Sequence, residues 1–422
     1  MNTLKELKTF IILWLTQALS SLGSSMTSFA LVIWLYKDSG SALTTALLTV
    51  CSYAPYVIVS IFAGAISDKW NKKAVMLICD SFAALSTVGV LVLLKAGALE
   101  VWHLYIINAL NGLMNSVQSP ASDVATTLLT PKQHYQKTSA MRYFSNSLVS
   151  IMTPVLASAI VTLAGLESVI AFDLATFVIA FTVLLLFIKI PEVPKNDTVK
   201  ETLLRSAKNG VSYLIGNKGI LFMILFLSAI NFIASIANAA LPALILSKSN
   251  EAALGAVSSC TGIAALVGSV IAAILPKPKS RSEAFCISLF ISMSTENFLL
   301  AFGNSTIVWC IGGLLGWITI PLMSANYDVI FRSTVPTEML GRVYSVRNTL
   351  QFFSIPVGYF LGGILIDKVF EPFMANTDNA LLLNVFGTAK GSGAAFLFFV
   401  IGVAGVLVCI FFSNIKALRE LG

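Results

Sequence analysis

The stretch Gly64-Ala65-Ile66-Ser67-Asp68-Lys69-Trp70-Asn71-Lys72-Lys73 is a polar, basic break between two long apolar runs. Gly64 lets neighbouring helices approach closely, because it carries no side chain. Asp68 is suited to cap or charge-pair at the positive N-terminal end of a helix. Lys69, Lys72 and Lys73 are expected to hold the loop on the cytoplasmic side of a membrane. We interpret the stretch as a gating hinge between two membrane helices; the simpler interpretation is a basic loop that only sets topology.

The composition is that of a protein built into a lipid bilayer. Of the 422 residues, 57% are hydrophobic and 11% charged, and the mean hydropathy is +0.86, whereas soluble domains carry about 25% charged residues. A spanning helix needs about 20 apolar residues, and Pro, Gly, Lys and Asp clusters divide the chain into runs of that order. The run from Phe10 to Tyr36 is too long for a signal peptide, whose apolar region has about 7 to 15 residues. The predicted fold class is therefore an all-α polytopic membrane protein.

We predict twelve transmembrane helices in two six-helix sets. The first set covers residues 10–36, 42–66, 74–95, 101–120, 140–165 and 168–189. The second set covers residues 219–246, 252–275, 284–302, 305–331, 343–369 and 392–413. The predicted domains are an N-terminal bundle at 1–190, a cytoplasmic linker at 191–217 and a C-terminal bundle at 218–422. The linker includes an amphipathic stretch at 199–215 that either lies on the membrane surface or bundle base, or is a passive tether.

The net charge of +7 follows from topology. With the N-terminus inside, 22 of the 27 Lys and Arg residues fall in cytoplasmic segments. The exceptions are Lys37, Lys95, Lys248, Lys368 and Lys390. Because cytoplasmic loops carry an excess of Lys and Arg, both termini are predicted to be cytoplasmic. The charge therefore does not indicate a nucleic-acid partner.

Two pairs of short matches suggest an internal repeat. Asp123-Val124 and Asp328-Val329 are each followed by a proline eight positions after the aspartate. Downstream, Thr153-Pro154-Val155 has a counterpart in Ile355-Pro356-Val357. Expected helices 4 and 5 thus match helices 10 and 11, which is the relation between two parallel six-helix repeats.

Several of these motifs resemble a known family. The pattern of residues 64–73 resembles the signature loop between helices 2 and 3 of the major facilitator superfamily, and residues 335–345, Val-Pro-Thr-Glu-Met-Leu-Gly-Arg-Val-Tyr-Ser, resemble the loop between helices 10 and 11 of its macrolide-efflux-like branch. Residues 14–20, Ser119-Pro120-Ala121 and Asp173 support the likeness, which spans nearly the whole chain. It implies the major facilitator fold and proton-driven export of amphipathic drugs such as macrolides from a bacterial plasma membrane. The branch also contains exporters of siderophores and peptides, which is the alternative.

The chain departs from this resemblance at two places. Helix 4 of the family often carries an arginine associated with proton coupling, and Asn111 stands there in this sequence. The glycine-rich antiporter motif of helix 5 is reduced to Thr153-Pro154-Val155-Leu156-Ala157-Ser158. Antiport is consequently less well supported by the sequence than export.

Polar side chains recur on one side of two expected helices. Gln17, Ser20, Ser21, Ser24 and Ser28 share a side of helix 1, and Asn108, Asn111 and Asn115 share a side of helix 4. Because amides are poorly tolerated against lipid, these stripes should face the bundle interior. They line a substrate cavity, as helices 1 and 4 do in the family, or they form interhelical hydrogen bonds. The candidates from the second half are Asn231, Asn238, Trp317 and Gln351.

Asp80, Asp173, Glu296 and Asp328 lie within expected spans, where ionisable groups are costly and usually functional. We expect Asp328 to pair with Arg332, and Asp80 to meet Arg142 or the lysines of residues 69–73. Glu296, Asp173 and Asp80 are the proton-coupling candidates, with the first two preferred. The usual peripheral place of helix 9 in the family argues against Glu296.

The resemblance implies rocker-switch alternating access. In this hypothesis Asp68 and Lys69 close the cytoplasmic side by pairing with the start of helix 11 near Gly341 and Arg342. Gly358, Gly362 and Gly363, with Pro356, supply close packing and a bend, or are simply packing glycines. The outer stretch at 370–393 is either a short interfacial helix or a tolerated insertion.

Other protein classes lack their motifs here. The sequence contains no H-E-x-x-H or G-x-S-x-G motif of an enzyme and no phosphate-binding loop of a transport ATPase. The cysteines and histidines show no metal-binding spacing. A channel is harder to exclude, although a two-half repeat suits a carrier better. We expect no enzyme activity, no metal and no cofactor beyond the proton gradient, a small amphipathic substrate and a monomeric chain.

Overall fold

The helices of this chain follow its apolar runs. The computed structural model describes residues 6–131, 134–191, 203–276, 278–335 and 340–421, and within them the elements are helices, with no strand. Ten helices in this described part are long and apolar enough to cross a membrane. One of these candidates, Phe144–Leu186, has 43 residues and covers two expected helices. The count of twelve and the side on which the termini lie stay predictions.

Contacts between Cα atoms divide the chain into two compact units. The first comprises Met1–Leu35 and Cys51–Lys200, and the second comprises Tyr36–Val50 and Glu201–Gly422. The predicted linker, residues 191–217, contains the division between the two units. Its residues 192–202 lie outside the described residues, and most of the rest is the helix Leu203–Gly216. The short segment Tyr36–Val50, between the first two expected helices, packs with the second unit.

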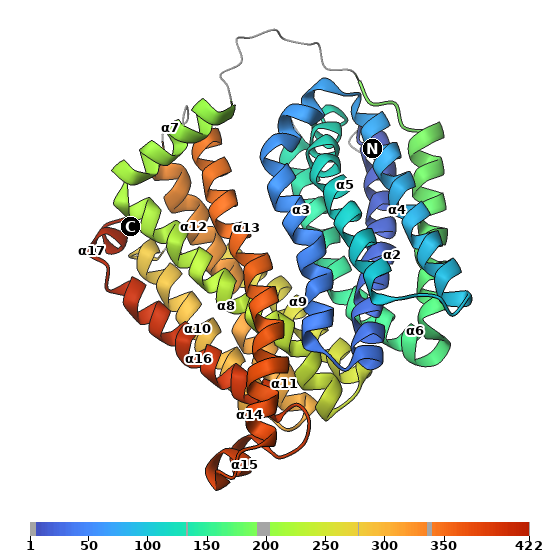
Figure 1. Ribbon diagram of the computed structural model, residues 1–422. Coiled ribbons are helices and arrows are strands. Elements are labelled where there is room, and N and C mark those ends of the chain that lie inside the picture. The colour runs from blue at the N-terminus through green and yellow to red at the C-terminus, as the bar shows by residue number, and fades with distance from the viewer. Residues whose placement is uncertain (1–5, 132–133, 192–202, 277, 336–339, 422) are drawn as a thin grey trace. The chain divides into compact units, whose positions relative to one another are not determined.

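The first unit contains five of the described helices. They are α2 (Lys8–Ser39), α3 (Ala42–Lys69), α4 (Lys72–Lys95), α5 (Val101–Leu128) and α6 (Tyr135–Leu186) (Figure 1). The C-terminal end of α2 and the N-terminal end of α3 belong to the segment Tyr36–Val50. The long α6 is two helices joined at Gly165, which has φ 79° and ψ 174°. Glycine reaches this conformation without strain, so the expected helices at 140–165 and 168–189 are joined without a loop.

Small residues allow the helices of the first unit to pack closely. A Cβ atom added to Gly112 would lie 2.1 Å from the carbonyl oxygen of Ser52, so α5 lies directly against α3. A Cβ atom on Gly23 would lie 2.9 Å from the Cα atom of Asp173, so α2 lies against α6. Because lipid supplies no hydrophobic force between helices, such close contacts hold the unit together.

The stretch at residues 64–73 is mostly helical. The helix α3 continues through Lys69, and Asn71 caps α4 by accepting a hydrogen bond of 3.1 Å from the backbone N–H of Ala74. Asp68 lies in the last turn of α3, and its side chain is outside the described part of the structure, so its role as a cap or charge partner stays a prediction. Lys73 Nζ donates to the carbonyls of Leu185 (2.9 Å) and Ile188 (2.8 Å), which ties the end of α6 to the start of α4.

The second unit holds the remaining described elements. They are α7 (Leu203–Gly216), α8 (Lys218–Lys248), α9 (Glu251–Ile274), α10 (Arg281–Phe302), α11 (Thr306–Trp317), α12 (Ile320–Thr334), α13 (Leu340–Ile364), the π-helix η2 (Leu365–Phe370), α14 (Glu371–Ala375), α15 (Ala380–Phe386), α16 (Ser392–Ser413) and α17 (Lys416–Arg419). The amphipathic part of the predicted linker is α7. The expected helix at 305–331 is divided into α11 and α12.

The helix α13 packs along α8 (Figure 1), and glycines of α13 lie at the contact. A Cβ atom on Gly358 would lie 2.6 Å from the carbonyl oxygen of Phe232, and one on Gly362 would lie 3.0 Å from the Cα atom of Ile236. The close packing predicted for these glycines is therefore present. Beyond α13, the outer stretch at 370–393 forms α14 and α15, and Phe386 packs its ring 5.2 Å from that of Phe396. The stretch is thus a folded part of this unit.

Candidate functional site

The polar stripes of α2 and α5 meet at a cavity within the first unit. The cavity has a volume of about 820 Å³, within the range of about 300–1,000 Å³ that is usual for small-molecule sites. All six first-half residues predicted to contact a substrate line it: Gln17, Ser20, Ser24, Asn108, Asn111 and Asn115. The helical spacing explains this placement, since residues three, four or seven positions apart share one side of a helix.

The cavity wall mixes polar and apolar side chains. The helix α3 contributes Ser52 and Tyr56, and α2 contributes Phe29 and Val32. The amides and hydroxyls of the stripes thus share the cavity with aromatic and aliphatic groups. Such a lining suits a small molecule with both polar and apolar parts.

Two side-chain amides of α5 differ in their hydrogen bonding. Asn108 Nδ2 donates to the carbonyl oxygen of Leu104 at 2.8 Å, so this donor is used within the helix. The Asn111 Oδ1 atom is buried and has no hydrogen-bond partner among the described residues. A buried polar atom without a partner is costly. Asn111, at the position where the family resemblance expects an arginine, is therefore a candidate acceptor for a hydrogen bond from a substrate.

Two buried carboxylates of the cavity are held by neutral groups. Asp173 on α6 is 4% exposed and accepts a hydrogen bond of 3.0 Å from Ser24 Oγ. Asp80 on α4 accepts a hydrogen bond from Gln118 Nε2. Both predicted proton-coupling residues of the first half therefore line the cavity. Each can carry a negative charge that these neutral donors do not neutralise.

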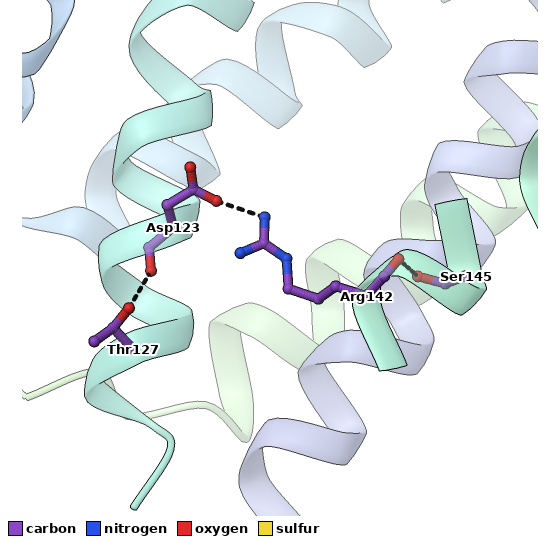
Figure 2. A network of polar contacts seen from close by, with 4 residues as sticks. All are labelled: Asp123, Thr127, Arg142 and Ser145. Carbon is purple, nitrogen blue, oxygen red and sulfur yellow. Dashed lines mark hydrogen bonds and ion pairs between the residues drawn. The ribbon is translucent and has the colours of Figure 1, made fainter. Parts of the chain in front are cut away.

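Figure 2 shows a third carboxylate of the cavity, which is paired with a base. Arg142 Nη2 on α6 lies 2.5 Å from Asp123 Oδ1 on α5, and both residues line the cavity. Thr127 and Ser145 donate to the backbone carbonyls of the two partners, at 2.9 Å each. The expectation that Arg142 meets Asp80 is therefore wrong, because Asp123 holds the guanidinium.

Sequence reasoning missed this ion pair as part of the site. From the sequence, Arg142 was counted among the cytoplasmic basic residues and expected near Asp80, and Asp123 entered only through the repeat. The available signal was a pair of opposite charges on two consecutive helices, 19 residues apart in the chain.

The second-half candidates lie elsewhere. Trp317 Nε1 on α11 donates to Glu296 Oε1 on α10 at 3.0 Å. Gln351 is 6% exposed and donates to the Tyr327 hydroxyl at 2.7 Å. On α8, Asn231 is half-buried and Asn238 is exposed. The lining of the first-unit cavity includes none of these residues, and their role at a substrate stays a prediction.

Asp328 lies near a different base from the one predicted. Arg347 Nη1 on α13 lies 3.8 Å from Asp328 Oδ1, and the guanidinium also lies 5.3 Å from the ring centre of Tyr327. The side chain of the expected partner, Arg332, lies outside the described part of the structure.

The predicted cytoplasmic latch falls mainly on residues whose side-chain surroundings lie outside the described part of the structure. These residues are Gly64, Asp68, Lys69, Gly341 and Arg342. Of the other two predicted members, Lys73 closes the end of α6 as described above, and Lys72 Nζ donates to the Trp70 carbonyl at 3.3 Å. The latch stays a prediction.

Comparisons with known proteins agree with this architecture. The model of the Major Facilitator Superfamily matches residues 13–359. Macrolide efflux protein A of Streptococcus pyogenes is 22% identical over 368 residues, covering 85% of this chain and 90% of the relative. The multidrug efflux pump Tap of Mycolicibacterium fortuitum is 22% identical over 376 residues, covering 86% and 91%. The enterobactin exporter EntS of Citrobacter koseri is 22% identical over 287 residues, or 66% of each chain.

Solved structures show the same fold. The nucleoside transporter NupG superimposes with a TM-score of 0.74 at 15% identity, covering 97% of this chain and 98% of the other. A bacterial homologue of the iron transporter ferroportin gives a TM-score of 0.68 at 16% identity, covering 97% and 99%. The long apolar helices, the polar cavity between them and a family match over most of the chain lead to one conclusion. This chain belongs to the Major Facilitator Superfamily and is a multi-pass membrane transporter of a small molecule, not an enzyme.

Proposed function

We propose that this protein is a secondary active exporter of small amphipathic molecules in a bacterial plasma membrane. Its substrates include drugs such as macrolides, the proton gradient drives export, and the two halves give alternating access to the substrate site by a rocker-switch motion. No cofactor besides the gradient is needed. The relatives named for macrolide and multidrug efflux support export, and their bacterial sources support the membrane.

The observation that carries the proposal is the lining of the first-unit cavity. It combines amides that can donate and accept hydrogen bonds with the rings of Tyr56 and Phe29. An amphipathic molecule can place its polar edge on Asn111 and Gln17 and its apolar part on the rings. A bare inorganic ion would leave the rings unused.

The charge of the cavity favours substrates that carry a positive charge. Asp80, Asp123 and Asp173 line it together with one described base, Arg142. Arg142 pairs with Asp123, which leaves two carboxylates held by the neutral donors Gln118 and Ser24. An amphipathic amine fits this surplus of negative charge, because buried charges require a partner.

Asp173 is the carboxylate that we assign to proton coupling. It is buried, it lines the cavity and its partner is a hydroxyl that can either donate or accept. Glu296 was the other preferred candidate from the sequence, but it is bonded to Trp317 and does not line this cavity. A proton carrier next to the substrate can exchange its proton for a bound cation, which couples the two flows.

The second candidate function is export of a metabolite such as a siderophore or peptide. The likeness to the enterobactin exporter of Citrobacter koseri favours it. The same cavity would then serve one endogenous substrate rather than several drugs.

Drug accumulation in a susceptible bacterium tests the proposal. Cells that express the full chain are loaded with a macrolide or with a hydrophobic cationic dye, with and without a protonophore. We expect lower accumulation than in cells expressing Asp173→Asn, and loss of that difference when the proton gradient collapses. Equal accumulation with verified membrane expression would contradict drug export and favour the metabolite exporter.

A further inference from the structure

The carboxylate of Asp367 completes the N-terminus of a helix that is far away in sequence. Asp367 lies in η2, directly after α13, and its oxygens accept hydrogen bonds from the backbone N–H groups of Ala42 (3.1 Å) and Leu43 (2.9 Å). The Ser41 hydroxyl donates to the same carboxylate at 2.5 Å. Residues 41–43 and 367 all belong to the second unit.

These bonds supply what α3 lacks at its start. The first four N–H groups of a helix have no partner within the helix. In α3, Thr44 N–H donates to Ser41 Oγ at 3.1 Å and Thr45 N–H to the Ser41 carbonyl at 3.4 Å. The other two, Ala42 and Leu43, depend on Asp367. A negative charge is favourable at this end of the helix dipole, so the start of α3 is matched to this carboxylate in geometry and in charge.

Other contacts hold the segment Tyr36–Val50 at the same place. A Cβ atom on Gly363 of α13 would lie 2.5 Å from the Cα atom of Leu43, so the two backbones touch. Lys390 Nζ donates to the carbonyl oxygen of Gly40 at 3.1 Å, and the Tyr36 hydroxyl lies 2.8 Å from Ser247 Oγ. The segment is therefore fastened by several polar and packing contacts of the second unit.

A second acidic residue caps a helix that lies wholly within the second unit. Glu371, four positions after Asp367, accepts hydrogen bonds of 3.1 Å each from the backbone N–H groups of Gly391 and Ala394 at the start of α16. The chemistry is the same, but α16 stays within the second unit. By contrast, α3 continues from Cys51 onward as part of the first unit. Asp367 thus fastens the start of a helix whose remainder belongs to the first unit.

We propose that Asp367 is a positioning residue that latches the outer end of α3 to the second unit during one half of the transport cycle. The positive-inside rule places this end of both helices outside the cell. The proposal rests on the proposed function in one respect, which is the alternating-access cycle in which the latch engages. The helices α3 and α13 would then have an acidic latch at each end. Asp68, near the end of α3, is predicted to meet the start of α13. Asp367, beyond the end of α13, binds the start of α3. The two latches would engage in turn.

The test is the accessibility of the latched segment from outside the cell. Ala42 is 1% exposed, so a cysteine there reports opening. Cells express the full-length Ala42→Cys protein in a background in which the six native cysteines are replaced, and a membrane-impermeant maleimide is added. We expect Asp367→Asn to raise the labelling rate about tenfold, as for loss of one hydrogen bond to a charged group. The matched control Glu371→Gln should leave the rate unchanged.

A steric variant opens the same latch without touching the carboxylate. Gly363→Ala places a methyl group against Leu43 and should also raise labelling, whereas Gly358→Ala faces α8 and should not. Wild-type labelling in both Asp367→Asn and Gly363→Ala, or an equal rise in Glu371→Gln, would overturn the latch. Labelling needs no transported substrate, so it is independent of whether drug export is observed. The export rate of Asp367→Asn, measured separately, should fall with the rise in labelling.

Discussion

At Gly112 the backbones of two helices touch, and a single methyl group is enough to separate them. We expect Gly112→Ala to destabilise the protein by about 1–3 kcal/mol, because the Cβ atom must displace a backbone carbonyl rather than a side chain. Its Cβ atom would lie 2.1 Å from the Ser52 oxygen. Gly89→Ala is the matched control, because the same construction finds no atom within 4 Å. Thermal unfolding in detergent measures both, and equal midpoints would contradict the packing described here.

The pair of Asp123 and Arg142 belongs to the cavity rather than to the framework. Its side chains are 55% and 42% exposed, and exposed pairs contribute at most about 1 kcal/mol. A double-mutant cycle with Asp123→Asn and Arg142→Gln should therefore give a coupling energy below that value in thermal unfolding. A coupling well above it would show that the pair holds α5 and α6 together and would contradict this assignment.

At the scale of elements, one lysine joins the ends of two helices. Lys73 donates to two carbonyls at the end of α6, and a cation near a helix C-terminus is worth about 0.3–1 kcal/mol. We expect Lys73→Met to increase amide hydrogen exchange about two- to fivefold around residues 183–188, by this free energy. Lys416→Met, at an exposed terminal helix, is the control. Unchanged exchange in Lys73→Met would contradict the cap.

The bounds of the elements were largely predictable from the apolar runs. The expected helices at 74–95, 219–246 and 392–413 correspond to Lys72–Lys95, Lys218–Lys248 and Ser392–Ser413. The divisions inside long elements were not predictable, because they depend on local backbone choices. Gly165 joins two helices without a loop, and η2 widens the end of α13. Neither choice changes hydropathy, so the apolar pattern carried no sign of it.

Hydrophobic and polar spacing predicted which residues of a helix line the cavity, but not which side chains of different helices contact one another. Helical spacing placed Gln17 and Asn111 on interior faces, and both line the cavity. The partners of the charged groups required knowledge of which helices touch. Arg142 binds Asp123 instead of Asp80, and Trp317 binds Glu296. The contact of Asp367 with α3 joins residues 324 positions apart, which no local pattern reveals.

At the scale of the whole molecule, proton coupling should depend on Asp173, which lines the cavity of the first unit, and not on Glu296, which does not. In proteoliposomes, Asp173→Asn should abolish uptake driven by an imposed proton gradient and retain counterflow, in which labelled substrate exchanges for unlabelled substrate. Glu296→Gln should retain both, because Glu296 bonds Trp317 away from the cavity. Loss of gradient-driven transport in Glu296→Gln alone would move the proton site to the second unit.

The central claim is that an amphipathic molecule crosses the membrane through the cavity of the first unit against its gradient. The most direct measurement is transport of a radiolabelled macrolide into proteoliposomes by purified protein under an imposed proton gradient, comparing wild type with Asn111→Leu. Asn376→Leu, at the exposed end of α14 in the second unit, is the control. The account predicts gradient-dependent transport by wild type and the control, and at least about tenfold weaker transport by Asn111→Leu, which replaces a polar cavity group with an apolar one. Wild-type transport by Asn111→Leu, or no gradient-dependent transport by well-folded wild-type protein, would contradict it.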